Sequence, residues 1–141
     1  MKRTVPGPGQ ESVWDYPRPP RVEPEHRTVR VVLGDTTIAE TSDARRVLET
    51  SHPPGIYLPP SAFLPGVLQP NERRTVCVWK GAASYWDLNV GERFVAAAGW
   101  SYPDPEPGFE PIGGYLSIYP GRVTACFLDD ERVQPQAGDF Y

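Results

Sequence analysis

The chain has 141 residues and a net charge of −4, with acidic and basic residues intermixed. This length is enough for one domain with its own core. Clustered Lys and Arg with a high isoelectric point, the pattern of a nucleic-acid-binding surface, are lacking. No apolar run approaches the roughly 18 residues of a membrane span, and none follows Lys2 and Arg3 as in a signal peptide. We therefore expect a cytoplasmic protein that contacts neither membranes nor nucleic acids.

The proline and cysteine content indicates which type of domain to expect. Eighteen prolines are well over twice the average usage, and together with 13 glycines they favour a turn-rich domain over a helical one. The two cysteines, Cys77 and Cys126, lie far apart and form no CxxC pair. This spacing argues against a zinc ribbon and against a secreted disulfide framework. We expect no metal and no cofactor.

The chain begins with a proline-rich arm, residues 1–27. Its prolines oppose regular hydrogen-bonded structure, so the arm is expected to be extended and mostly irregular. Trp14 and Tyr16 lie within it, and an aromatic pair in such a segment indicates that the arm packs on the body of the protein. The remaining residues, 28–141, are expected to form a single domain.

Short strands and turns follow in this domain. Residues 42–49 fit either one or two helical turns or a strand. Either element must end by His52, because Pro53 disfavours the helical conformation in the residue before it. Residues 61–64 fit another helical turn. The pattern predicts a compact all-β domain of short strands with at most one or two helical turns. The predicted strands are residues 28–33 and 36–39 as a hairpin, 56–58, 73–79 after a turn at 70–72, 85–90 and 93–102 as a second hairpin, and 115–119 and 123–128 as a last hairpin.

Residues 75–86 (TVCVWKGAASYW) carry the most chemically capable side chains. On a straight strand, Cys77 and Lys80 point to opposite faces. A site shared by both residues therefore requires a local irregularity, which Gly81 permits. Cys77 is either a small buried hydrophobe or a nucleophile activated by His52 or Lys80. Lys80 either extends to solvent or binds an anion.

A second stretch of interest is residues 49–54 (ETSHPP). Glu49 and His52 have the spacing of half a helical metal motif, but the chain has only one other histidine, so no metal is expected. The two prolines after His52 make a rigid turn that fixes the imidazole, and Glu49 can orient it as a general base or an anion-binding group. The alternative is a histidine that only completes the turn. We expect Glu49, His52 and Lys80 to approach one cavity.

Taken together, five motifs resemble the domain of unknown function 427 (DUF427) family of bacteria and fungi, which is also described as nucleotidyltransferase-like. They are residues 13–19 (VWDYPRP), 49–54, 75–81 (TVCVWKG), 85–86 (YW), and Gly114-Tyr115 with Tyr119-Pro120. The family's central Cys-x-Trp-Lys-Gly motif matches Cys77, Trp79, Lys80 and Gly81. The resemblance spans nearly the whole chain and implies a bacterial protein with a compact domain similar to the β-tent fold. Zinc-binding relatives of that fold use two CxxC pairs, which this chain lacks.

Three functions remain open. The first is a module that binds a small polar or anionic ligand, with aromatic walls and a few polar groups. The second is an enzyme of acyl or nucleotidyl transfer in which Cys77 is the nucleophile, His52 the acid or base, and Lys80 stabilises negative charge. The third is a partner-binding scaffold that uses the proline-rich arm. The expected ligand-binding residues are Arg46, Glu49, Tyr57, Trp79, Tyr85 and Trp86, beside His52 and Lys80.

Overall fold

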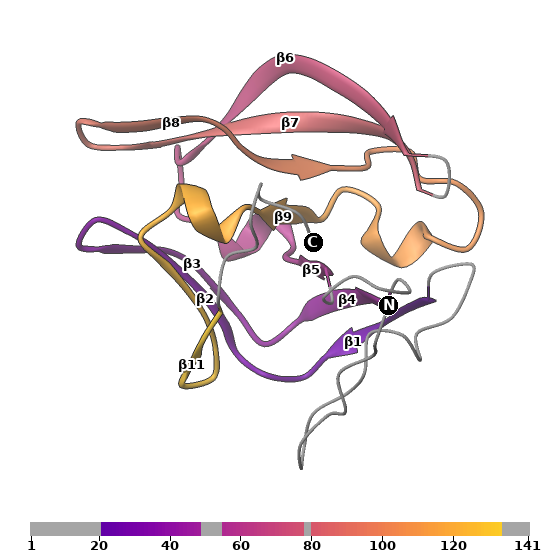
Figure 1. The fold of residues 1–141 in the computed structure, drawn as a ribbon, viewed down its shortest axis with the longest axis horizontal. Helices are drawn as coiled ribbons and strands as arrows, with labels where there is room; N and C mark the ends of the chain where they lie inside the picture. The colour runs from indigo at the N-terminus through magenta and orange to yellow at the C-terminus, as the bar shows by residue number, and fades with distance from the viewer. Residues whose placement is uncertain (1–20, 49–54, 78–79, 134–141) are drawn as a thin grey trace, which may run out of the picture.

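The computed structural model describes residues 21–48, 55–77 and 80–133 (Figure 1). Over these ranges the chain forms three antiparallel sheets, and its only helices are three short 3₁₀ turns. The prediction of a compact all-β domain is confirmed. None of the helices in these ranges is long and apolar enough to cross a membrane.

The first sheet has the order β1-β4-β5. The range 42–49, for which a helical turn or a strand was open, contains a strand that pairs with a neighbouring strand on each side. Arg21–Glu25 also forms a strand, although it belongs to the arm that was expected to be mostly irregular. Pro24 is tolerated there because β1 is an edge strand, where a missing N–H breaks no ladder. The strands are β1 (Arg21–Glu25), β4 (Ala44–Leu48) and β5 (Gly55–Tyr57).

The second sheet has the order β11-β10-β2-β3. The predicted hairpin around Gly34 and Asp35 is present, and Gly34 has a φ of +63°, a value that favours glycine in such a turn. The strands are β2 (Val29–Leu33), β3 (Thr36–Thr41), β10 (Ala125–Leu128) and β11 (Glu131–Arg132).

The third sheet has the order β6-β7-β8-β9, and its long strands form one layer of the molecule, at the top of Figure 1. The predicted β7–β8 hairpin is present. The turn predicted at residues 70–72 is wrong, because these residues lie within β6, where a bulge between Asn71 and Arg74 absorbs the irregularity. The strands are β6 (Leu68–Cys77), β7 (Gly81–Val90), β8 (Arg93–Ser101) and β9 (Leu116–Ile118).

The last predicted hairpin is wrong. β9 pairs with β8, whereas β10 pairs with β2 in another sheet. The 3₁₀ turn Pro120–Arg122 lies between them, with proline at its first position, where no backbone donor is needed. The two strands are therefore neighbours in sequence but belong to different sheets. The helical turn expected near residues 61–64 is present as the 3₁₀ turn Pro60–Ala62.

Buried side chains gather in two clusters of different composition. The first, which we call the aliphatic cluster, takes most of its members from β2, β3, β7, β8 and β9, and consists of Val29, Val31, Leu33, Ile38, Ala39, Ala44, Leu58, Phe63, Val67, Leu88, Ala98, Leu116, Ile118 and Cys126. The second, the aromatic cluster, lies between the first and third sheets and consists of Val47, Tyr57, Ala83, Tyr85, Trp100, Tyr102, Phe109 and Ile112.

Candidate functional site

Cys77 and Lys80 are brought together at the end of a β-hairpin. Cys77 ends β6 and pairs with Gly81, the first residue of β7, so the chain reverses direction between them. Gly81 has a φ of +111°, and a Cβ at this position would lie 3.4 Å from the backbone carbonyl of Asp104. This backbone conformation, which other residues rarely adopt, favours glycine here. The irregularity at Lys80–Gly81 that a shared site requires is therefore present.

Lys80 is buried at this reversal, with 7% of its surface exposed. Its amine donates a hydrogen bond to Cys77 Sγ over 3.8 Å. The amine also lies 5.8 Å from the centroid of the Tyr102 ring, within the range of a cation–π contact. The backbone carbonyl of Lys80 accepts a hydrogen bond from Glu106 N at 2.9 Å, which fixes the reversal against a loop of the third sheet. Cys77 itself is only half-buried.

Tyr57 and Trp100 continue the site away from Lys80. The Tyr57 ring lies 6.3 Å from the Tyr102 ring and meets Trp100 edge to face at 6.2 Å. The Tyr57 hydroxyl accepts a hydrogen bond from Trp100 Nε1 at 3.2 Å, so this buried indole donor has a partner. Trp100 then packs on Tyr119, with the ring centroids 4.5 Å apart. The rings form a continuous series from β5 across β8 to the end of β9.

Hydroxyl groups and arginines gather at the opposite end of this series. Tyr85 shares a hydrogen bond of 2.9 Å with Thr75 Oγ1. Burial raises the pKa of Tyr119, and the neighbouring Tyr85 raises it further. Arg73 lies over the Tyr85 ring at 4.7 Å, and Arg122 over the Tyr119 ring at 4.5 Å.

Two predicted ligand-binding residues lie elsewhere. Arg46 pairs with Ile56 on the neighbouring strand, whereas Tyr57 pairs with Arg45, so Arg46 and Tyr57 face opposite sides of the first sheet. Trp86 follows Tyr85 directly along β7 and therefore points to the other face of the third sheet. There its Nε1 donates to Ser101 Oγ at 2.9 Å, and its ring packs against the aliphatic cluster.

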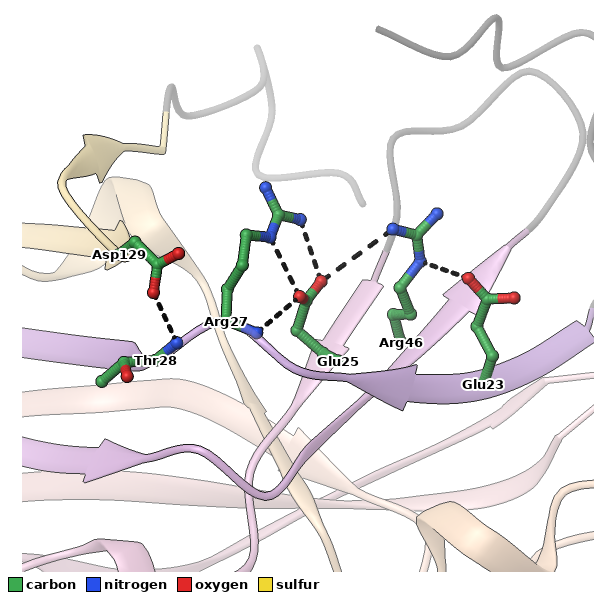
Figure 2. Close-up of polar contacts among 6 residues, drawn as sticks. All are labelled: Glu23, Glu25, Arg27, Thr28, Arg46 and Asp129. Atoms are coloured by element: carbon green, nitrogen blue, oxygen red, sulfur yellow. Dashed lines mark hydrogen bonds and ion pairs between the residues drawn. The ribbon is translucent and has the colours of Figure 1, made fainter. Parts of the chain in front are cut away.

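Arg46 belongs to an ion-pair network that joins β1 to β4 (Figure 2). Its guanidinium lies 2.9 Å from a carboxylate oxygen of Glu23 and 4.0 Å from one of Glu25. Glu25 is 4% exposed and also accepts two side-chain hydrogen bonds of 2.9 Å from Arg27. Burial by itself raises the pKa of Glu25, but the hydrogen bonds from Arg27 and the charges of Arg27 and Arg46 outweigh it and lower the pKa. The network thus engages Arg46 with carboxylates on the side of the sheet away from Tyr57.

The predicted residues Glu49, His52 and Trp79 lie outside the described residues. The same holds for residues 1–20, including Trp14 and Tyr16 of the proline-rich arm. Of the cavity expected for Glu49, His52 and Lys80, the structure describes the place of Lys80 alone.

Trp100, Tyr102 and Tyr119 are members of the site that the sequence analysis did not select. Trp100 pairs directly with Tyr85 across β7 and β8, so the two side chains share a face. Tyr102 lies two positions after Trp100, and alternation along a strand places it on that same face. The predicted pairing of residues 85–90 with 93–102 contained this signal, whereas the contact with Tyr119 depends on the placement of β9.

A comparison with protein families identifies the family of this chain. The domain described as "Domain of unknown function (DUF427)" matches residues 21–129, which is well over half of the chain. The chain belongs to the DUF427 family. A search of curated proteins finds no match. The range that matches DUF427 contains Cys77, Lys80 and every residue of the aromatic cluster.

Proposed function

We propose that this DUF427 domain binds a small anionic or polar ligand where Lys80 and Cys77 meet the aromatic cluster. What supports the proposal is the burial of Lys80, whose amine is held 3.8 Å from Cys77 Sγ and beside the Tyr102 ring. Lysine is among the residues least often buried, because removing its ammonium group from water is costly.

The neighbouring side chains fit the remainder of such a ligand. Small-molecule sites combine apolar and aromatic walls with a few polar groups that fix orientation. In the proposed site, the Lys80 amine contacts the anionic or polar group of the ligand, and the rings of Tyr57, Tyr85 and Tyr102 contact its apolar part. The hydroxyls of Tyr57 and Tyr85 supply hydrogen-bonding groups that are already held in place by Trp100 and Thr75. The predicted residues Glu49, His52 and Trp79 remain candidates for the same site.

Thermal denaturation with a panel of small carboxylates, phosphates and sulfonates tests the proposal. A ligand that binds only the folded protein raises its melting temperature. We expect at least one compound to do so for the wild type and for Arg93→Met, a control that removes an exposed cation of β8. Lys80→Met should weaken that binding about tenfold or more, because a hydrogen bond to a charged group contributes about 1.5–3 kcal/mol. Equal binding by Lys80→Met, or no stabilisation by any compound, would contradict the proposal.

A transfer enzyme with Cys77 as nucleophile is the second candidate. The observation that favours it is the contact between the half-buried sulfur of Cys77 and the Lys80 amine, since thiols beside a lysine are among the reactive ones. In this reaction the Cys77 sulfur forms a bond to an acyl carbon or a nucleotidyl phosphorus, and the bond from that atom to the leaving group breaks. Lys80 stabilises the negative charge that develops on the carbonyl or phosphoryl oxygen. The test is alkylation of the native protein by iodoacetamide, in the wild type and in His52→Ala. Slower labelling of Cys77 in the variant supports a catalytic base at His52, and unchanged labelling counts against it.

A further inference from the structure

We propose that Cys77 and Lys80 are a modification site at which hydrogen peroxide joins the two side chains through a sulfur–nitrogen bond. The structure holds the reacting atoms together, because Lys80 Nζ donates its hydrogen bond to Cys77 Sγ over 3.8 Å. The pairing of Cys77 with Gly81 fixes the backbone on both sides of this contact. The inference rests on this geometry alone and does not depend on the proposed ligand.

The reaction has two steps and consumes one molecule of peroxide. In the first, the Cys77 thiolate attacks peroxide, an S–O bond forms, the O–O bond breaks, and hydroxide leaves, which gives a sulfenic acid. In the second, the neutral amine of Lys80 attacks the sulfur, an S–N bond forms, and the S–O bond breaks. The departing hydroxide takes a proton from the nitrogen and leaves as water. The sulfur is oxidised by two electrons, the peroxide is reduced, and the protein loses two hydrogen atoms.

The contact favours this second step over further oxidation of the sulfur. A sulfenic acid condenses with a nearby nitrogen or thiol when one is within reach, and otherwise proceeds to sulfinic acid. Placing the two reactants beside each other makes their reaction effectively unimolecular. The lysine side chain has several rotatable bonds, so its amine can move from hydrogen-bonding distance to bonding distance without a change in the backbone. The half-buried position of Cys77 leaves the sulfur reachable by peroxide.

Cys126 provides a control within the same protein. It is buried in the aliphatic cluster, and burial raises the pKa of its thiol to about 12. Because the thiolate is the form that reacts, Cys126 should resist peroxide under conditions that oxidise Cys77.

The experiment uses the full chain, a slight molar excess of peroxide at mildly alkaline pH, and digestion with trypsin without reductant. Trypsin cleaves the unmodified chain after Arg74 and Lys80, which releases residues 75–80. A cross-linked Lys80 is no longer cleaved, so the peptide extends to the next arginine and covers residues 75–93. Its mass is that of the unmodified sequence less two hydrogen atoms. The variant Cys126→Ala excludes a disulfide between the two cysteines, which would remove the same number of hydrogens.

We expect the peptide 75–93, lighter by two hydrogens, from the wild type and from Cys126→Ala. Dithiothreitol should restore the free side chains and cleavage at Lys80, because a thiol attacks the sulfur and releases the amine. Lys80→Arg should give Cys77 as sulfenic or sulfinic acid with normal cleavage, since a guanidinium is a poor nucleophile. Sulfinic or sulfonic acid on Cys77 of the wild type, with Lys80 cleaved as usual, would overturn the proposal. Loss of the two hydrogens only when Cys126 is present would overturn it as well.

Discussion

Each of the two clusters of buried side chains has one cysteine in it or beside it, and the surroundings of these two cysteines differ. Cys126 lies in the aliphatic cluster, whose other members are aliphatic residues and one phenylalanine. Cys77 packs against the aromatic cluster, and its sulfur contacts the amine of Lys80. The same residue type thus has an inert environment in one region and a polar, ionisable neighbour in the other.

The polar groups of the two regions differ in the same way. The aliphatic cluster offers no hydroxyl or charge, so its members contribute to the free energy of folding through burial and packing alone. In the aromatic cluster, the Trp100 indole donates a hydrogen bond to the Tyr57 hydroxyl, and the Tyr85 hydroxyl shares one with Thr75. Such a network places defined donors and acceptors beside ring faces, which is the composition of binding sites. This difference supports the proposal that the aromatic cluster contributes to ligand binding, whereas the aliphatic cluster contributes to the stability of the fold.

The largest expected difference between the two regions is the reactivity of the cysteines. With iodoacetamide and native protein near neutral pH, we expect Cys77 to be labelled at least about a hundredfold faster than Cys126. The reasons are the half-buried position of Cys77 and the burial that raises the pKa of Cys126 to about 12. Peptide mass spectrometry over a time course measures both rates in one sample. Similar rates would remove the distinction on which the comparison rests.

The next effect in size is the loss of packing in the aliphatic cluster. Leu88 has no exposed surface, and Leu88→Ala should lower the free energy of unfolding by about 2–5 kcal/mol, from lost burial and the cavity left behind. Val76 lies on the exposed side of β6, and Val76→Ala should change the free energy of unfolding by no more than about 0.5 kcal/mol. Urea denaturation measures both variants. A small effect at Leu88 would show that the cluster does not maintain the fold.

A smaller effect is expected in the aromatic cluster from Tyr57→Phe. The substitution keeps the ring but removes the hydroxyl that accepts from Trp100 Nε1. Leaving a buried donor without this acceptor should lower the free energy of unfolding by about 1–3 kcal/mol. Ligand binding should weaken in the same variant if the hydroxyl contacts the ligand. Full stability together with unchanged binding would exclude the hydroxyl from both roles.

The smallest predicted effect depends on pH and concerns Glu25, outside both clusters. Its pKa is lowered in the folded protein, so the carboxylate stabilises the fold above the ordinary value of 4.5, and this stabilisation is lost as the pH falls through the lowered value. Glu25→Gln removes the charge at every pH. We therefore expect the variant to have a lower free energy of unfolding than the wild type near neutral pH, and this difference should disappear in acid. A gap that stays constant from neutral to acid pH would show that the ion pairs with Arg27 and Arg46 do not contribute.

Local sequence signals predicted much of the fold. The hairpins β2–β3 and β7–β8 follow from turn residues between β-prone runs, and the need for an irregularity at Lys80–Gly81 follows from side-chain alternation and one glycine. Family membership also followed from motifs in the sequence. These features depend on residues that are close along the chain, so the sequence by itself determines them.

The tertiary structure decided which distant segments meet. β9 and β10 look like a hairpin in sequence, but each completes a different sheet, because strand partners are chosen by the burial of whole faces rather than by proximity along the chain. Whether Arg46 faced Tyr57 depended on the register of β4 with β5, and a shift of one residue exchanges the two faces. The meeting of Tyr57, Trp100 and Tyr119 likewise required three segments to pack together. Such contacts depend on long-range packing, which alternation and turn chemistry along a single chain do not specify.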